Sequence, residues 1–131
     1  MLITRSRSFL RAAYGARYGL HMDVDSSHTH TVPAVPEFQS QAYDAAAGLF
    51  RAAGDPERLR LLHQLSGGER CVSDLAASAG VTMSTVSQRL RVLRAEGMVT
   101  RRRAGKHMYY RIADDHVADL IRNALDHATH D

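Results

Sequence analysis

The feature that most constrains the fold of this 131-residue chain is a change in hydrophobic period at Gly97. Before this glycine, apolar residues such as Leu90 and Leu93 recur at helical spacing. After it, residues 98–112 form two strand-like runs on either side of a turn at Gly105. Helices followed by a hairpin predict a mainly α domain with a small β element, in the α+β class.

Capping signals divide the helical part into four segments. Asp55 and Pro56 suit the N-cap and first turn of one helix, and Thr82 suits the N-cap of another. Gly80 predicts a tight turn between a short third helix and a fourth helix, so these two form a helix-turn-helix. The hairpin that follows makes the motif a winged helix-turn-helix. The predicted helices cover residues 41–53, 56–66, 73–78 and 83–96.

A last helix is predicted over residues 115–129, with its apolar residues on one stripe. No later predicted element covers this stripe, and an uncovered apolar stripe suits an interface between two copies of the chain. We therefore expect a homodimer that is formed by the N- and C-terminal helices. The stripe consists of Val117, Leu120, Ile121, Ala124 and Ala128.

Residues 1–40 are expected to be a disordered N-terminal extension, and residues 41–131 are expected to form the folded domain. Residues 1–21 contain four arginines and no acid, without the apolar core and cleavage site of a secretory signal. We expect this stretch to be disordered or not native, with translation then starting at Met22. The chain has no apolar run near the length of a membrane span, so we expect no membrane partner.

Positive charge is concentrated from Arg89 to Arg111, where the sequence has eight Arg or Lys residues and one acid, Glu96. Such a cluster indicates an anionic partner, most simply double-stranded DNA. The second helix of the motif is expected to enter the major groove, and the wing to reach phosphates or a minor groove. Further along that helix, Arg91 and Arg94 suit contacts with phosphates or acids. The predicted DNA contacts are Ser84, Thr85, Ser87, Gln88, Arg89 and Arg91 on the helix, and Arg101, Arg102, Arg103, Lys106 and His107 on the wing.

Asp114, His116, His127 and His130 form a second pattern. Three imidazoles and one carboxylate are a complete ligand set for zinc or a similar divalent metal. On one helix, His116 and His127 share a face but lie about 16 Å apart along the axis, so one metal cannot bind both within a chain. Two antiparallel copies of the helix bring Asp114 and His116 of one chain to His127 and His130 of the other. The pattern therefore predicts two symmetric metal sites in a dimer.

The chain resembles the ArsR/SmtB family of bacterial metal-sensing repressors in four segments, which read AGDPERLRLL, CVSDL, VSQRLRVL and GKHMYYRI. The resemblance covers residues 41–131, and the segment NALDH at residues 123–127 is similar to the zinc-sensing branch. This resemblance implies that a metal-free dimer holds its operator and that metal binding weakens its affinity for DNA. It also implies that the metal ligands are Asp114, His116, His127 and His130.

Some relatives have a further metal site, and this chain retains part of it. Cys71 and Asp74 match two of its ligands, and His28 and His30 lie in the corresponding part of the tail, which contains no cysteine. Ser73 replaces the second cysteine of the arsenic-sensing pattern, so an arsenite site is not expected. These four residues are therefore a second candidate metal site.

Alternative functions remain open at this level. A DNA-binding regulator could respond to redox state through Cys71, and a nickel or cobalt sensor could recruit His28 or His30. A metal-storage protein would leave the basic wing unexplained. An enzyme is not expected, because the sequence shows no nucleophile–base pair or phosphate loop and the proposed metal has four protein ligands. The lone cysteine fits a reducing cytoplasm, and the sequence does not decide among Zn²⁺, Co²⁺, Cd²⁺ and Ni²⁺.

Overall fold

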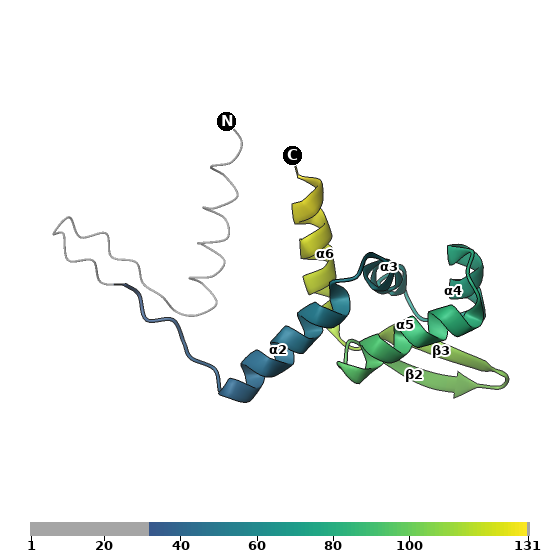
Figure 1. Ribbon diagram of the computed structural model, residues 1–131, viewed down its shortest axis with the longest axis horizontal. Helices are drawn as coiled ribbons and strands as arrows, with labels where there is room; N and C mark the ends of the chain where they lie inside the picture. The colour runs from purple at the N-terminus through teal and green to yellow at the C-terminus, as the bar shows by residue number, and fades with distance from the viewer. Residues whose placement is uncertain (1–31, 131) are drawn as a thin grey trace. The chain divides into compact units, whose positions relative to one another are not determined.

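The computed structural model describes residues 32–130, and residues 32–39 contain neither helix nor strand. A compact unit begins at Gln39, two residues before the predicted domain boundary. Met22, His28 and His30 lie outside the described residues. Within the compact unit the elements follow the order α2 (Ser40–Ala53), α3 (Pro56–Leu65), β1 (Arg70–Cys71), α4 (Val72–Ala79), α5 (Met83–Ala95), β2 (Val99–Ala104), β3 (His107–Ile112) and α6 (Asp115–Thr129) (Figure 1).

The corner between α2 and α3 is fixed by two side chains. Asp55 is the N-cap of α3, and its carboxylate accepts hydrogen bonds from the backbone N–H groups of Glu57 (3.1 Å) and Arg58 (3.0 Å). The Arg58 guanidinium donates in turn to the carbonyls of Ala52 (2.7 Å) and Arg51 (3.3 Å), at the C-terminal end of α2. Backbone groups that helix ends leave unpaired are thus satisfied on both sides of the corner. The N–H of Arg58, above all, holds the pKa of the Asp55 carboxyl below its usual value.

Helices α4 and α5 form the predicted helix-turn-helix. Gly80 ends α4 in the left-handed conformation (φ 65°), which a residue without a side chain adopts at little cost. Thr82 is the N-cap of α5, and its hydroxyl accepts a hydrogen bond from the backbone N–H of Thr85 (3.2 Å). The predicted turn and cap are therefore both confirmed.

The wing is a hairpin of β2 and β3, as predicted, and it belongs to a sheet of three antiparallel strands. The order is β1-β3-β2, so β3 is central. The short strand β1 pairs with β3 through Cys71 opposite Tyr109 and was not predicted from the sequence. A strand of two residues leaves no visible alternation, and its partner lies nearly forty residues away along the chain.

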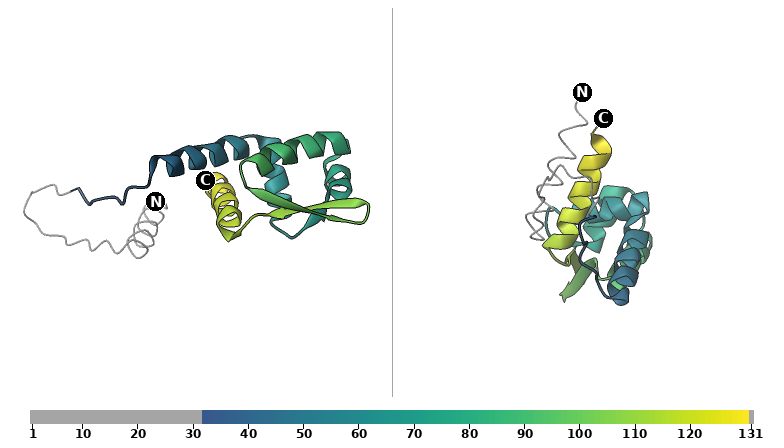
Figure 2. Two further views of the ribbon diagram at one scale, coloured as in Figure 1. Left: turned by 90° about the horizontal axis from the view of Figure 1, so that it is seen from below. Right: turned by 90° about the vertical axis from the view of Figure 1, so that its left-hand side faces the viewer.

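The core is built from the apolar faces of the helices and the inner end of the wing. Leu62 of α3, Leu75 of α4 and Leu90 of α5 are fully buried in it, and so are Met98 and the first residue of β2, Val99. Helix α5 thus lies against α4, α3 and the base of the wing (Figure 2). This packing holds the second helix of the motif in one orientation. Among the described residues, no helix is both long and apolar enough to cross a membrane.

Helix α6 has the predicted bounds, but its apolar residues do not form one stripe facing one partner. Val117 and Ile121 are buried within the chain's own core, and Leu125 packs against that core. In contrast, Ala124 and Ala128 are exposed. The prediction of a single uncovered stripe was wrong, because α3 covers one side of the helix and leaves the other side open.

Replacing Leu90 by alanine should lower the free energy of unfolding by about 2–5 kcal/mol, because it opens a cavity in a fully packed core. Val92 lies two residues away on the same helix and is 38% exposed, so Val92→Ala is the matched control. Urea unfolding followed by circular dichroism measures both variants. Equal losses for the two variants would contradict this description of the core.

Candidate nucleic-acid interface

Helix α5 presents one exposed polar face to solvent. Ser84, Ser87, Gln88 and Arg91 are exposed and follow the spacing of one helical face. The buried residues of α5 lie on the opposite side, with Val86 among them. Core packing therefore turns these four side chains outward.

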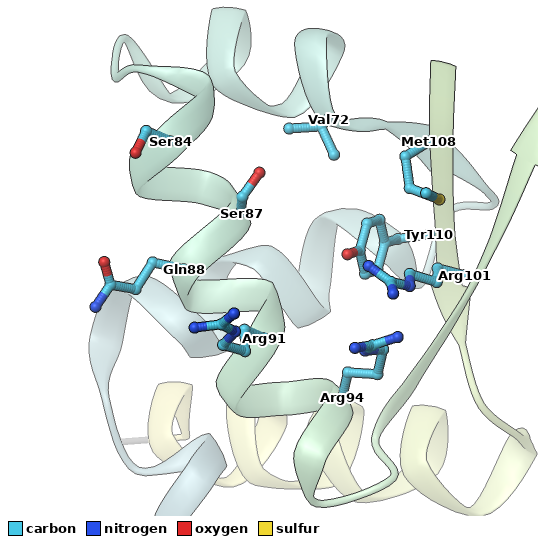
Figure 3. Close-up of a pocket in the computed structure, with 9 residues that line it drawn as sticks. All are labelled: Val72, Ser84, Ser87, Gln88, Arg91, Arg94, Arg101, Met108 and Tyr110. Carbon is cyan, nitrogen blue, oxygen red and sulfur yellow. The ribbon is translucent and has the colours of Figure 1, made fainter. Parts of the chain in front are cut away.

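This exposed face forms one wall of a groove whose other wall is the wing (Figure 3). The groove has a volume of about 540 Å³ and ends against the start of α4. Three guanidinium groups lie along it, those of Arg91 and Arg94 from α5 and of Arg101 from β2. Within residues 32–130, none of the three forms an ion pair. The groove is therefore a concave surface with uncompensated positive charge, which suits an anionic ligand.

Two predicted DNA contacts on α5 face away from this groove. Arg89 is turned toward α3, where its guanidinium lies 3.9 Å from the carboxylate of Glu57, and its side chain is only 25% exposed. Thr85 is half-buried, and its hydroxyl bonds with that of Thr82 (2.9 Å). Neither residue lines the groove. They lie on the next strip of the helix surface from Ser84 and Gln88, and their contacts with DNA remain predictions.

The wing arginines divide between the two faces of the hairpin. Arg101 is paired directly with Tyr110 across β2 and β3, and both line the groove. Arg102 points to the other face, where it donates to the carboxylate of Glu69 (2.5 and 3.0 Å) and lies 5.0 Å from the ring centre of Tyr109. Arg102 thus attaches the wing to the loop before β1. Its predicted contact with DNA remains a prediction.

The other wing residues lie near the tip of the hairpin. Arg103 is paired with Met108 and shares the groove face. Lys106 is exposed in the turn between the strands. His107 lies on the opposite face, with its ring centre 6.4 Å from that of Tyr109. None of these three residues lines the groove, and their contacts with DNA remain predictions.

Sequence reasoning missed the floor of the groove. Val72, Met108 and Tyr110 lie there. The signal for two of them was present, since Met108 and Tyr110 alternate along β3 and oppose Arg103 and Arg101 once the hairpin register is known. Val72 comes from α4 and carries no such local signal.

The four predicted metal ligands lie at the two ends of α6. Asp114 is its N-cap and accepts a hydrogen bond from the backbone N–H of Val117 (3.0 Å). His116 is 91% exposed, with its Nδ1 3.8 Å from the Asp114 carboxylate. His127 lies in the last turn, and His130 follows the helix with an extended backbone. Nowhere in residues 32–130 do three His, Cys, Asp or Glu side chains gather closely enough to hold a metal.

The second candidate metal site is only partly described. Cys71 is 6% exposed and its sulfur lies 3.1 Å from the Ser73 hydroxyl. Asp74 is exposed in the first turn of α4. His28 and His30 fall outside the described residues. The structure brings no third ligand to Cys71 and Asp74 within residues 32–130.

Comparison with known proteins identifies the family. Residues 55–101 match the model of the arsR family of bacterial regulatory proteins. The HTH-type transcriptional repressor SmtB of Mycobacterium tuberculosis is 40% identical over 101 residues, covering 77% of this chain and 73% of that protein. The chain belongs to the ArsR/SmtB family.

Two further likenesses agree with this. A "Transcriptional repressor SmtB homolog" of Synechocystis is 48% identical over 81 residues, but the match spans only 62% of this chain and 61% of that relative. A homodimeric winged helix-turn-helix DNA-binding domain of Mycobacterium bovis has 33% identity and a TM-score of 0.64, covering 72% of this chain and 90% of that domain. The winged helix-turn-helix fold of this ArsR/SmtB protein is thus confirmed by structure and by likeness.

The link between wing and body in this ArsR/SmtB protein should be sensitive to acid. The hydrogen bond from Arg102 holds the pKa of the Glu69 carboxyl below its usual value. At pH values above the ordinary glutamate pKa of about 4.3, the link should contribute fully to the stability of the fold. This contribution should be lost as the pH falls through the lower pKa that Glu69 has in the folded protein. Thermal unfolding of wild type and Glu69→Gln should differ at neutral pH and converge in acid. A difference that persists unchanged in acid would contradict this role.

Proposed function

We propose that the protein is a metal-responsive transcriptional repressor that binds operator DNA as a homodimer and is released when zinc, or a similar divalent metal, binds between the C-terminal helices. The observation that carries the DNA-binding half is the groove beside the exposed face of α5, with three arginines that form no ion pair within residues 32–130. The proposed setting is the bacterial cytoplasm, and the proposed activity is regulatory and not enzymatic.

The groove fits the way in which helix-turn-helix proteins read DNA. The second helix of such a motif enters the major groove with its N-terminal residues toward the bases. Ser84, Ser87 and Gln88 lie in the first turns of α5, and the arginines come later on the helix and on the wing. Short hydroxyls allow close approach, and a glutamine can form two hydrogen bonds with adenine. Base contacts would thus come from the start of α5, and phosphate contacts from its end and from the wing.

The open side of α6 supports a dimer. Exposed Ala124 and half-buried Leu120 lie on this side, next to the apolar residues that α3 covers. The C-terminal turns of α6 extend beyond the other helices of the compact unit (Figures 1 and 2), and Phe50 of α2 is 62% exposed. An alanine in the middle of a helix face allows another helix to approach closely. We infer that a second copy packs here and that α2 contributes to the same interface.

Such a dimer would complete the metal site. Across eleven residues of an unbroken helix, His116 and His127 lie within about 20° of the same face and about 16 Å apart along the axis. An antiparallel partner helix therefore places His127 and His130 of the partner subunit against Asp114 and His116. The side chains of Asp114 and His116 are 56% and 91% exposed, so they are accessible to a shared metal. Imidazole and carboxylate ligands suit Zn²⁺, and also Co²⁺, Cd²⁺ and Ni²⁺.

Regulation follows if metal and DNA favour different arrangements of the dimer. A metal that joins the two copies of α6 restricts how the two DNA-reading helices are spaced. If metal weakens operator affinity by a given factor, operator DNA weakens metal affinity by the same factor.

Replacing either His116 or His127 by alanine should raise the zinc concentration needed for operator release by about tenfold or more, because each change removes a metal ligand. The measurement is fluorescence anisotropy on an operator duplex that the wild-type protein selects from a random DNA library, titrated with buffered zinc. His63→Ala is the control, since it removes an exposed imidazole from α3. Release of either variant at the wild-type zinc concentration would reject the ligand assignment.

Mixed dimers test whether each site is shared between chains. A dimer of one His116→Ala protomer and one His127→Ala protomer retains one intact site if the ligands come from both chains, whereas neither homodimer retains any. Co-purified mixed dimers should therefore bind one tetrahedral Co²⁺ per dimer, measured by visible absorption. Absence of binding in the mixed dimer, with two ions bound by the wild-type dimer, would place the site within single chains.

A further inference from the structure

The hydroxyl of Tyr110 has no hydrogen-bond partner among residues 32–130. The side chain is 4% exposed, and Figure 3 shows the hydroxyl directed into the groove between α5 and the wing. Gln64 Oε1 is the one fully buried side-chain polar atom without a partner in residues 32–130, so the Tyr110 hydroxyl is open to the groove. The hydroxyl is therefore free to donate a hydrogen bond to a ligand that enters the groove.

Two arginines frame this hydroxyl from opposite walls. Figure 3 shows Arg94 of α5 and Arg101 of β2 extending toward one another next to Tyr110. The position of Arg101 is fixed by the hairpin, since it is paired directly with Tyr110 across the two strands. Both positive charges line one groove, and none of its lining residues within residues 32–130 is an acid. An anion between them would relieve their repulsion.

We propose that Arg94, Arg101 and the Tyr110 hydroxyl hold one phosphodiester group of the DNA backbone. This inference rests on the proposed DNA-binding function and specifies one contact within it. The guanidinium groups donate to the non-bridging oxygens, for which their planar shape is well suited, and the tyrosine hydroxyl donates from the floor. The groove continues along α5 to Ser87 and Ser84, which fits a strand of DNA crossing it better than an isolated small anion.

This phosphate seat, formed by Arg94, Arg101 and Tyr110, gives the groove a mechanical role. One wall belongs to the DNA-reading helix and the other to the wing, so a bound phosphate joins the two elements. The contact carries no sequence information. It sets the depth and angle at which Ser84 and Gln88 meet the bases.

The test is a scan of the selected operator duplex in which single phosphates are replaced by neutral methylphosphonates. For the wild-type protein, one substitution per half-site should weaken binding by about tenfold or more. In Arg94→Gln and Arg101→Gln that same substitution should weaken binding less than it does in the wild-type protein, because one of the two charges that face the phosphate is already gone. Tyr110→Phe keeps the ring but removes the hydroxyl. In this variant, the methylphosphonate at the same position should cause a smaller loss of DNA affinity than in the wild-type protein.

Salt dependence provides a second readout. With two seats in a dimer, the slope of log affinity against log salt should fall by about two in Arg94→Gln and Arg101→Gln. Both variants should lose affinity equally for the operator and for a random duplex. The matched control is Arg60→Gln, which removes an exposed arginine of α3 and should behave like wild type.

The outcomes separate this proposal from the function on which it rests. A wild-type protein that selects no operator would refute the repressor function itself. If the protein binds its operator but the losses of affinity caused by the methylphosphonate and by the arginine variants simply add, only the phosphate seat would be overturned. Orthophosphate added at constant ionic strength should leave the wild-type complex intact. If orthophosphate displaces DNA from the wild-type protein but not from Arg94→Gln, the seat binds a free anion. That result would also overturn the proposal.

Discussion

The burial of one apolar strip of α5 determines most of what this protein presents to a partner. Val86, Leu90 and Leu93 are fully buried, so the rotation of the helix about its axis is fixed. Ser84 and Gln88 then face outward. The same rotation turns Arg89 toward Glu57 on α3. Core packing alone thus decides which polar side chains of α5 can contact DNA and which support the fold.

Strand register has the corresponding effect on the wing. Because side chains alternate along a strand, adjacent arginines of β2 point to opposite faces. Arg101 faces the groove, while Arg102 binds Glu69 and lies over Tyr109. The run of three arginines therefore has two functions that composition cannot separate. One arginine supplies charge to the interface, and its neighbour holds the hairpin against the body of the domain.

The parts of the fold that could be predicted are those with local signals. The Asp55 cap, the left-handed Gly80 and the hairpin turn depend on a few neighbouring residues, and the structure has all three. Strand β1 could not be predicted, because its two residues become a strand only by pairing with β3. The faces of Thr85 and Arg89 were open to prediction, since helical spacing from Val86 and Leu90 already places them beside the core. The groove floor required the hairpin register, which links Tyr110 to Arg101.

The proposed metal ligands and the exposed polar residues of α5 lie on helices that share a third helix. Both α5 and α6 pack on α3, whose Leu62 is fully buried in the core. Well-packed interiors shift between discrete arrangements and deform little otherwise, so a force on α6 passes to α3 and α5 as a movement of the whole unit. The position of α6 relative to a partner subunit would then set the spacing of two rigid DNA-reading surfaces. Metal bound at the dimer interface could oppose DNA binding in this way without altering any residue in the groove.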